Sequence, residues 1–309
     1  MIASIFTIRP LSPFGTPLAG DSLFGQLCWA LALRRGKEGL EKALAGYDSG
    51  MPFAVVSDGL PSGLLPRPTL PAEFVESGPS DPKLRKQIRS LKWLPSSQAN
   101  LPVRDWVQKA VTGDAGMLAA RTQNTINRHT GTTGRGIFAP RQVEQIVFKP
   151  ETRLDIHTVH DPAHVSTDEL QGLLSDIGLS GFGRDASTGL GKFEVECVNS
   201  KPAPGDFLHA MTLAPCAPDA STLDETGCWW QPVTRFGRHG STAALGAGGG
   251  PFKKPVLLAR TGAVLKWHSV QSSLFHGTGL GGASRPISGV IPGTVHQGYA
   301  PVIPLIMGQ

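Results

Sequence analysis

The chain has 309 residues, of which 40% are hydrophobic and 17% are charged, and its formal net charge is +5. This composition is typical of a globular protein of one large or two ordinary domains, and no apolar run reaches the roughly 18 residues of a membrane span. The N-terminal sequence MIASIFTIRP lacks the regions of a secretory signal, so we expect a cytoplasmic protein that does not contact a membrane.

The positive charge mildly favours a polyanionic partner but does not identify one. The four cysteines show neither paired spacing nor the density of a disulfide framework, so we expect buried free thiols and no structural zinc. They are Cys28, Cys197, Cys216 and Cys228.

The N-terminal residues predict a strand and then a helix. Residues 2–9 are rich in Ile, Phe and Thr and end at Pro10, as expected of a strand followed by a Gly/Pro loop. The helix begins at Asp21 or Ser22, either of which can cap it, and ends at Gly36 after a cationic last turn. Its broad apolar face predicts packing against the core.

The next elements are shorter. Residues 53–57 predict a strand, and residues 83–94 predict a helix whose basic face is of the kind usually exposed to solvent. Apolar runs at 143–148 and 154–159 predict two further strands.

Residues 117–145, most of which precede the strand predicted at 143–148, have the composition of an inserted arm, because they combine Asn, Thr and Gly with cations and only one acid, Glu144. Two interpretations stay open: an exposed polar loop, or an arm whose cations contact phosphates and stack on splayed bases while its asparagines hydrogen-bond to bases or 2′-hydroxyls. Ile137 and Phe138 are either an apolar wedge or the return to the core. The candidate RNA-binding residues of the arm are Arg121, Asn124, Asn127, Arg128, His129, Arg135 and Arg141.

A second helix follows the strand at 154–159. Ser166 and Glu169 form a capping box, apolar residues follow at helical spacing, and Gly178 is the expected stop. The alternating residues 193–199 then predict a strand with one buried face. The element order β-α-β-β-α-β is that of a ferredoxin-like (RRM-like) module.

The stretch SGFGRDASTGLGKFEV, residues 180–195, joins this helix to the last strand. It is not a P-loop, since Phe193 follows Gly191 and Lys192, and it is not a dinucleotide fingerprint, which follows a strand and opens a helix. It is either a connection that needs positive φ angles or a backbone that approaches a polyanion closely. The candidate RNA-binding residues are Gly181, Gly183, Arg184, Gly189, Gly191 and Lys192.

The remainder predicts a second module. Residues 199–205 have the composition of a linker, and strands are expected at 206–214, 255–267 and 301–307. We therefore expect an α+β protein with an N-terminal ferredoxin-like module at 1–200, carrying the arm, and a second, degenerate ferredoxin-like module at 201–309.

Catalytic and metal-binding patterns are weak. His157, His160 and His164 have spacings that a helix could align for a metal, but Pro162 and the strand pattern argue against a helix there. We expect surface histidines at a strand end, no metal and no cofactor. Asp21 is better explained as a helix cap than as a catalytic acid.

Four stretches resemble one family. GFGRDASTGLGKFEV resembles the glycine-rich loop of the RAMP superfamily of CRISPR-associated RNA-binding proteins, and PFGTPLAGDSLFGQLCWAL at 13–31 resembles its first loop and helix. NTINRHTGTTGRGIFAP at 124–140 resembles an inserted arm, and HQGYAPVIPL at 296–305 resembles the ending of the fourth Csm subunit of type III-A complexes.

The resemblance implies a non-catalytic subunit that holds the 5′ tag of the crRNA in a type III-A surveillance complex. Its implied partners are the large polymerase-like signature subunit, the adjacent backbone RAMP subunit and, indirectly, target RNA. Two alternatives remain: the tag-capping subunit of another type III subtype, or a RAMP endoribonuclease that processes precursor crRNA with a histidine base.

Overall fold

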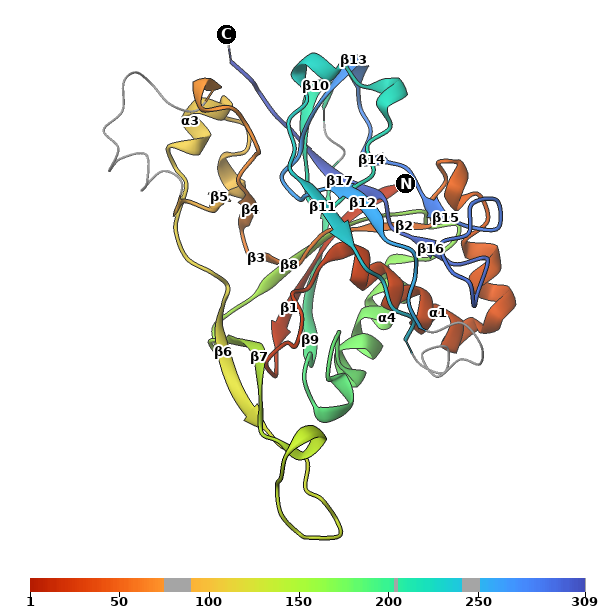
Figure 1. Ribbon diagram of the computed structural model, residues 1–309. Coiled ribbons are helices and arrows are strands. Elements are labelled where there is room, and N and C mark those ends of the chain that lie inside the picture. The colour runs from red at the N-terminus through yellow and green to blue at the C-terminus, as the bar shows by residue number, and fades with distance from the viewer. Residues whose placement is uncertain (75–89, 203–204, 241–250, 309) are drawn as a thin grey trace.

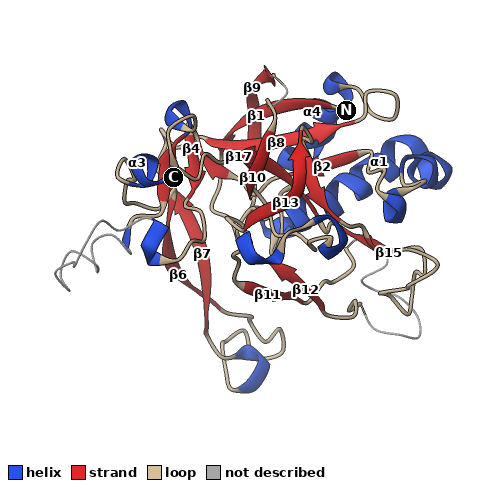
Figure 2. Ribbon diagram, turned by 90° about the horizontal axis from the view of Figure 1, so that it is seen from above, coloured by secondary structure: helices blue, strands red, loops and turns tan. Residues whose placement is uncertain are grey.

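The computed structural model describes residues 1–309 apart from 75–89, 203–204, 241–250 and 309 (Figure 1). In the described part, helices pack on one side of an N-terminal sheet and a second sheet lies on its other side (Figures 1 and 2). The α-helices are α1 (Gly20–Ala43), α3 (Val103–Val107) and α4 (Thr167–Ser180). None of the described helices is long and apolar enough to cross a membrane.

The N-terminal sheet has the predicted ferredoxin-like topology. Its four main strands run in the order β2-β8-β1-β9, and each neighbouring pair is antiparallel. Counted along the β-α-β-β-α-β path, this order is 2-3-1-4, the order of a ferredoxin-like module. The strands are β1 (Ile2–Pro10), β2 (Ala54–Val56), β8 (Leu154–His160) and β9 (Phe193–Lys201).

Helix α1 follows its apolar pattern but differs at its predicted start. Leu23, Leu27 and Leu31 are fully buried against the sheet. The predicted stop at Gly36 is confirmed, because Gly36 has non-helical angles (φ 74°, ψ 179°) that end the first helical segment; a second segment, which the sequence did not predict, continues to Ala43.

The expected cap is corrected, because Asp21 lies inside the first turn of α1 and Ala19 precedes the helix without a side-chain cap. The Gly20 N–H, which has no partner within the helix, instead donates to Oδ1 of Asp58 at 2.8 Å.

Helix α4 begins as predicted and ends later. The Ser166 hydroxyl accepts a hydrogen bond from the Glu169 N–H at 3.2 Å. The helix continues past Gly178 to Ser180, with Gly181 as its C-cap. Gly178 serves packing instead, because a Cβ there would lie 2.1 Å from the Phe193 carbonyl oxygen of β9.

An insertion between β2 and β8 forms a small subdomain and a long hairpin. The hairpin strands β6 and β7 extend away from the body of the protein (Figure 1). The helix predicted at 83–94 falls mainly on residues outside the described part, and at its described end Trp93 and Leu94 belong to a strand. The strands of the insertion are β3 (Leu60–Pro61), β4 (Leu64–Pro66), β5 (Trp93–Pro95), β6 (Gly116–Gln123) and β7 (Arg141–Phe148).

The C-terminal residues form a second antiparallel sheet in the order β13-β10-β17-β14. The single strand predicted at 255–267 is two strands, β12 and β13, and residues 199–201 of the predicted linker belong to β9. The strands are β10 (Phe207–Thr212), β11 (Pro232–Arg235), β12 (Val256–Ala259), β13 (Val264–Gln271), β14 (Phe275–Gly277), β15 (Leu280–Gly281), β16 (Val295–His296) and β17 (Tyr299–Pro304).

A second ferredoxin-like module at 201–309 stays a prediction. Along the chain the second sheet has the order 2-1-4-3, and the described residues after 201 contain no α-helix. The two halves also share contacts: Tyr299 packs on Tyr47 in the N-terminal core, with ring centroids 5.2 Å apart. The Gln297 amide donates to the Val56 carbonyl and accepts from the Val56 N–H, both at 2.9 Å. The halves therefore form one packed unit.

Candidate nucleic-acid interface

The glycine-rich loop is built against the first loop of the chain. The Gly191 N–H donates to the Pro13 carbonyl at 2.8 Å, and the Lys192 N–H donates to the Ser12 hydroxyl at 2.9 Å. Within the loop, the Phe182 N–H donates to the Gly191 carbonyl at 2.8 Å. These bonds hold the loop closed on itself and on the segment that leads into α1.

The loop glycines have a structural role in this closure. Gly181, Gly183, Gly189 and Gly191 all have positive φ angles, from 76° to 98°. A Cβ at Gly191 would lie 2.0 Å from the Phe182 carbonyl oxygen, and one at Gly181 would lie 2.4 Å from that of Leu190. A Cβ at Gly189 would meet open space. The close backbone approach is thus made by the protein's own chain at Gly181 and Gly191, and RNA contact by these glycines stays a prediction.

The two cations of the loop differ in their surroundings. The Arg184 guanidinium donates to the Glu144 carbonyl at 2.5 Å and lies 3.6 Å from the Asp185 carboxylate. Arg184 therefore ties the loop to β7 of the hairpin. Lys192 is exposed and has no ion pair with any described residue.

The predicted arm is the hairpin of β6 and β7. Its register places Arg121 opposite Val143 and Arg141 opposite Gln123. Because side chains alternate along a strand, Arg121 and Arg141 share one face, while Glu144 lies on the other. The only acid between residues 117 and 145 is therefore separated from both arginines by the plane of the hairpin.

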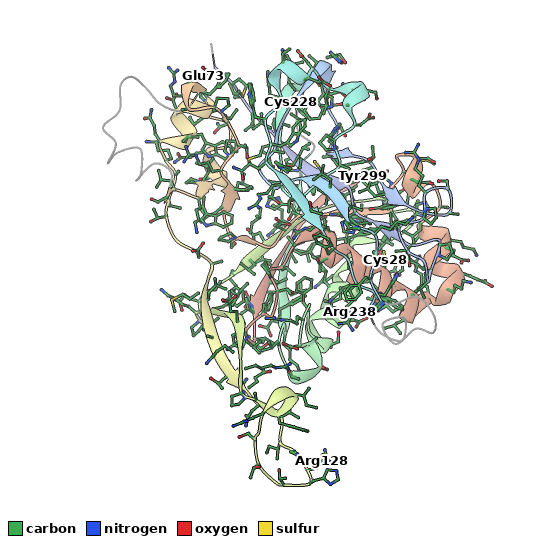
Figure 3. All side chains as sticks on the ribbon, viewed as in Figure 1. Cys28, Glu73, Arg128, Cys228, Arg238 and Tyr299 are labelled. Atoms are coloured by element: carbon green, nitrogen blue, oxygen red, sulfur yellow. The ribbon has the colours of Figure 1, made fainter. Side chains whose placement is uncertain are left out.

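The tip of the hairpin is held by local polar contacts. The Asn127 N–H donates to the Thr132 carbonyl at 3.0 Å, and the Asn127 side-chain oxygen accepts from the His129 N–H at 2.9 Å. Arg128 lies at the far end of the hairpin (Figure 3). Ile137 is 83% exposed, as a wedge would be, while Phe138 is half-buried.

The cationic side chains of the arm are exposed and unpaired. Within the described residues, none of them has a side-chain hydrogen bond or an ion pair, and Asn124 is exposed without one as well. Such side chains do not stabilise the hairpin, so they are available to an external anion. They are Arg121, Arg128, His129, Arg135 and Arg141.

Cavities adjoin the base of the arm. Cavities of about 340, 700 and 570 Å³ all include Pro17 of the first loop in their walls. Leu118 and Ile146 of the hairpin line the first two, and Arg235 and Arg260 line the third. The concave surface therefore extends from the hairpin to the C-terminal half.

Of the three histidines near residue 160, His157 and His160 are not surface residues as expected, whereas the His164 side chain is 40% exposed. His157 is 7% exposed and its pKa is lowered to about 3, mainly by burial; His160 is fully buried and its Nε2 lies 3.2 Å from the Thr167 hydroxyl. His157 and His160 point to opposite faces of β8, because they are three residues apart in a strand. In the described ranges, no group of three or more His, Cys, Asp or Glu side chains is arranged to hold a metal.

Of the free cysteines, Cys197 is exposed, contrary to expectation.

Sequence reasoning missed the buried ion pair at Asp21. Asp21 Oδ2 lies 2.9 Å from Nε of Arg235 and 3.4 Å from Nε2 of His296. Burial acts to raise the Asp21 pKa, but the contact with His296 and the charge of Arg235 outweigh it and hold the pKa below its usual value. Asp21 thus joins α1 to β11 and β16.

The chain thus combines a ferredoxin-like sheet, a glycine-rich loop before the last strand of that sheet and an inserted hairpin. No protein-family model matches the sequence, and no curated protein matches it. Solved structures of the Csm4 kind share the fold, as the following comparisons show.

The chain resembles one in the crystal structure of a Csm1-Csm4 cassette in complex with cA4, with a TM-score of 0.62 and 15% identity over 99% of both chains. It also resembles one in the crystal structure of a Csm3-Csm4 subcomplex of the type III-A CRISPR-Cas interference complex. There the TM-score is 0.60 and the identity 12%, over 98% of this chain and 99% of that one. The fold is therefore Csm4-like over nearly the whole chain.

Proposed function

We propose that this protein is an RNA-binding subunit of a type III CRISPR effector complex. The observation that carries the proposal is the hairpin of β6 and β7, whose exposed cations have no partner among the described residues. A phosphate backbone supplies the charge that these side chains lack, and guanidinium groups also stack on unpaired bases.

In its finer form, the proposal is that the subunit belongs to a type III-A complex and holds the crRNA 5′ tag. The fold likeness to chains of the Csm1-Csm4 and Csm3-Csm4 structures supports this assignment, because it extends over nearly all of both chains. By the same argument, we propose that the protein docks a large signature subunit and an adjacent backbone RAMP subunit in the cytoplasm, and meets target RNA only indirectly.

We further propose that the subunit has no catalytic role. A histidine general base works best when its pKa is near the operating pH and it can reach the proton that it removes. His157 is buried with a pKa lowered to about 3, and His160 is enclosed on the other face of β8. Neither histidine suits cleavage of a precursor crRNA.

The experiment is to purify the tagged protein from its native or reconstituted operon, extract the bound nucleic acid and sequence its ends. We expect crRNAs that share a repeat-derived 5′ tag, together with a large signature subunit. The identity of that subunit distinguishes type III-A from another type III subtype. A protein that carries no RNA but cleaves repeat RNA without metal would replace the proposal with the endoribonuclease alternative.

A matched variant links this result to the arm. Arg121→Ala combined with Arg128→Ala removes two unpaired cations, and Lys37→Ala removes an exposed cation on α1. The arm variant should recover less crRNA than the wild type, and the α1 variant should recover the same amount. Equal recovery with both variants would contradict RNA binding by the arm.

A further inference from the structure

Strands β11 and β12 form a two-stranded ribbon, defined here as residues 232–239 and 251–259. Thr234 lies opposite Leu257, and beyond the end of β11 Arg238 lies opposite Phe252. The ribbon crosses the front of the molecule in Figure 1 and lies at its edge in Figure 2. Exposed and less exposed residues alternate strictly from 232 to 239, so the ribbon has one inner and one outer face.

The inner face holds the ribbon in place. Arg235 forms the ion pair with Asp21, and Nε2 of the buried His239 lies 2.7 Å from the Ser288 hydroxyl. The backbone N–H of Lys254 donates to the Ile287 carbonyl at 2.7 Å. Because these contacts secure the ribbon, substitutions on its outer face should leave the fold intact.

The outer face combines aromatic, aliphatic and cationic side chains that the fold does not use. Phe236 is 74% exposed, and Phe252 and Leu257 are each 68% exposed. Arg238 and Lys254 are exposed beside them and have no ion pair with any described residue. Figure 3 shows Arg238 on this side of the protein. Apolar side chains gathered on one exposed face, rimmed by polar residues, mark an interaction site.

The charge of this region favours an anionic ligand. No aspartate or glutamate follows Glu225 in the sequence, whereas the same stretch contains seven lysines and arginines. The buried Asp21, supplied by α1, is already paired with Arg235 on the inner face. The outer cations therefore lack an acidic partner nearby in the chain.

We infer that the outer face of the ribbon binds single-stranded RNA, with bases stacked on Phe236 and Phe252 and phosphates contacted by Arg238 and Lys254. Aromatic rings that present their faces beside cations are typical of surfaces for unpaired nucleic acid. The inference rests on the proposed function for the identity of the ligand. It adds a second RNA contact, separate from that of the arm.

The test measures binding of a labelled single-stranded oligoadenylate to the full-length protein by fluorescence anisotropy. The double variant Phe236→Ala, Phe252→Ala should bind at least about tenfold more weakly, because stacking contributes about 1–3 kcal/mol per base. Replacing both phenylalanines by Trp should preserve binding, since Trp also stacks, while replacing both by Leu should not. Leu33→Ala on α1, where Leu33 is 83% exposed, is the matched control and should bind like the wild type.

A second measurement tests the cations. Arg238→Gln combined with Lys254→Gln should lower the slope of log affinity against log salt by about 1.4, from about 0.7 per phosphate contact on a single strand. Ultraviolet crosslinking followed by mass spectrometry should place RNA on the ribbon in the wild type. Circular dichroism melting checks that each variant is folded.

The outcomes separate this inference from the proposed function. Wild-type affinity in the double Ala variant, or full binding in the double Leu variant, would overturn the ribbon as a stacking surface; the Leu result would point to a protein partner.

Loss of binding in Arg121→Ala, Arg128→Ala alone would leave the arm as the RNA site without the ribbon. Loss in the ribbon variant alone would retain the ribbon and refute the arm. Absence of oligoadenylate binding by the wild type would overturn the ribbon inference, whereas the proposed function is tested by the recovery of crRNA from the operon.

Discussion

Oδ2 of Asp21, in the first turn of α1, lies 2.9 Å from Nε of Arg235 in β11, a residue of the C-terminal half. The Asp21 side chain is 2% exposed, and the Arg235 side chain is 34% exposed. A buried carboxylate that loses its cation is destabilising, because the remaining charge is not compensated. The pair therefore makes the position of the ribbon depend on α1.

We predict that Arg235→Met lowers the free energy of unfolding by about 3 kcal/mol. Asp21 would then keep its contact with Nε2 of His296 and the hydrogen bond from the Ser22 N–H. Asp176→Asn, which breaks the exposed pair with Arg34, should cost less than about 1 kcal/mol. Urea unfolding of the two variants measures the difference, and equal losses would mean that the Asp21 pair is not effectively buried.

Asp58 predicts a pH dependence. Burial raises its pKa to about 6, although hydrogen bonds from Thr261 and Gly20 act to lower it. The folded pKa lies above the unfolded value of about 3.9, so the native state holds a proton that the unfolded chain releases. This contribution, about 2–3 kcal/mol, is complete below about pH 4 and is lost as the pH rises through about 6.

The measurement is the free energy of unfolding between about pH 4 and 7. It should fall with rising pH in the wild type and be flatter in Asp58→Asn, which keeps an acceptor for the Gly20 N–H. The lowered pKa of Asp21 affects stability below about pH 4, where stability rises with pH instead of falling. The effects of the two carboxylates therefore occur in different pH ranges. An unchanged slope in Asp58→Asn would refute the assignment.

The loop glycines should respond differently to substitution. Gly191→Ala introduces a Cβ 2.0 Å from the Phe182 carbonyl oxygen at a positive φ, so we expect a loss above about 2 kcal/mol. Gly189→Ala creates no clash, so we expect it to cost only the strain of a positive φ, about 1 kcal/mol. Thermal unfolding of both variants tests the order. Melting points that differ little would show that the loop relaxes around the new methyl group.

Gly189 is also the position at which RNA contact by the loop can be tested. Gly183 is less suitable, because a Cβ there would lie 2.0 Å from the Thr16 hydroxyl oxygen and a larger side chain would disturb the first loop. We expect a bulky residue at 189 to reduce crRNA retention by the folded protein. Retention equal to that of the wild type would leave the loop with its structural role alone.

The arm arginines should contribute to RNA affinity mainly through charge. Each of Arg121→Ala, Arg128→Ala and Arg141→Ala should lower the slope of log affinity against log salt by about 0.7, with little change in thermal stability. Salt titrations with a single-stranded RNA measure the slope. If the variants lose affinity without a change in slope, the side chains contact bases and not phosphates.

Local patterns in the sequence predicted the N-terminal sheet well. The strands β1, β8 and β9 and the helices α1 and α4 have apolar residues at the spacing of their own secondary structure, so a single chain is sufficient to place them. The glycine-rich loop was located by the helix and the strand that flank it. The predicted stop at Gly178 failed, whereas that at Gly36 held, because a glycine that ends a helix and one that admits a neighbouring backbone are alike in sequence.

Features that depend on distant residues could not be predicted in this way. His157 was expected at the surface, but the second sheet lies against its face of β8 and buries it. The pairing of Asp21 with Arg235 and His296 has no local signature. One available signal was overlooked: no acid follows Glu225, so cations such as Arg238 and Lys254 have no acidic partner within that stretch of the chain.

The paired hydrogen bonds between Gln297 and Val56 have a consequence for synthesis of the protein. Strand β2 is at the edge of the N-terminal sheet, and the Gln297 amide satisfies its backbone from the far end of the chain. While the ribosome is still making the second half, that edge is open, and open edges are sites at which chains pair with one another. A fragment ending near residue 200 would keep this edge permanently, and we expect it to aggregate where the full chain does not.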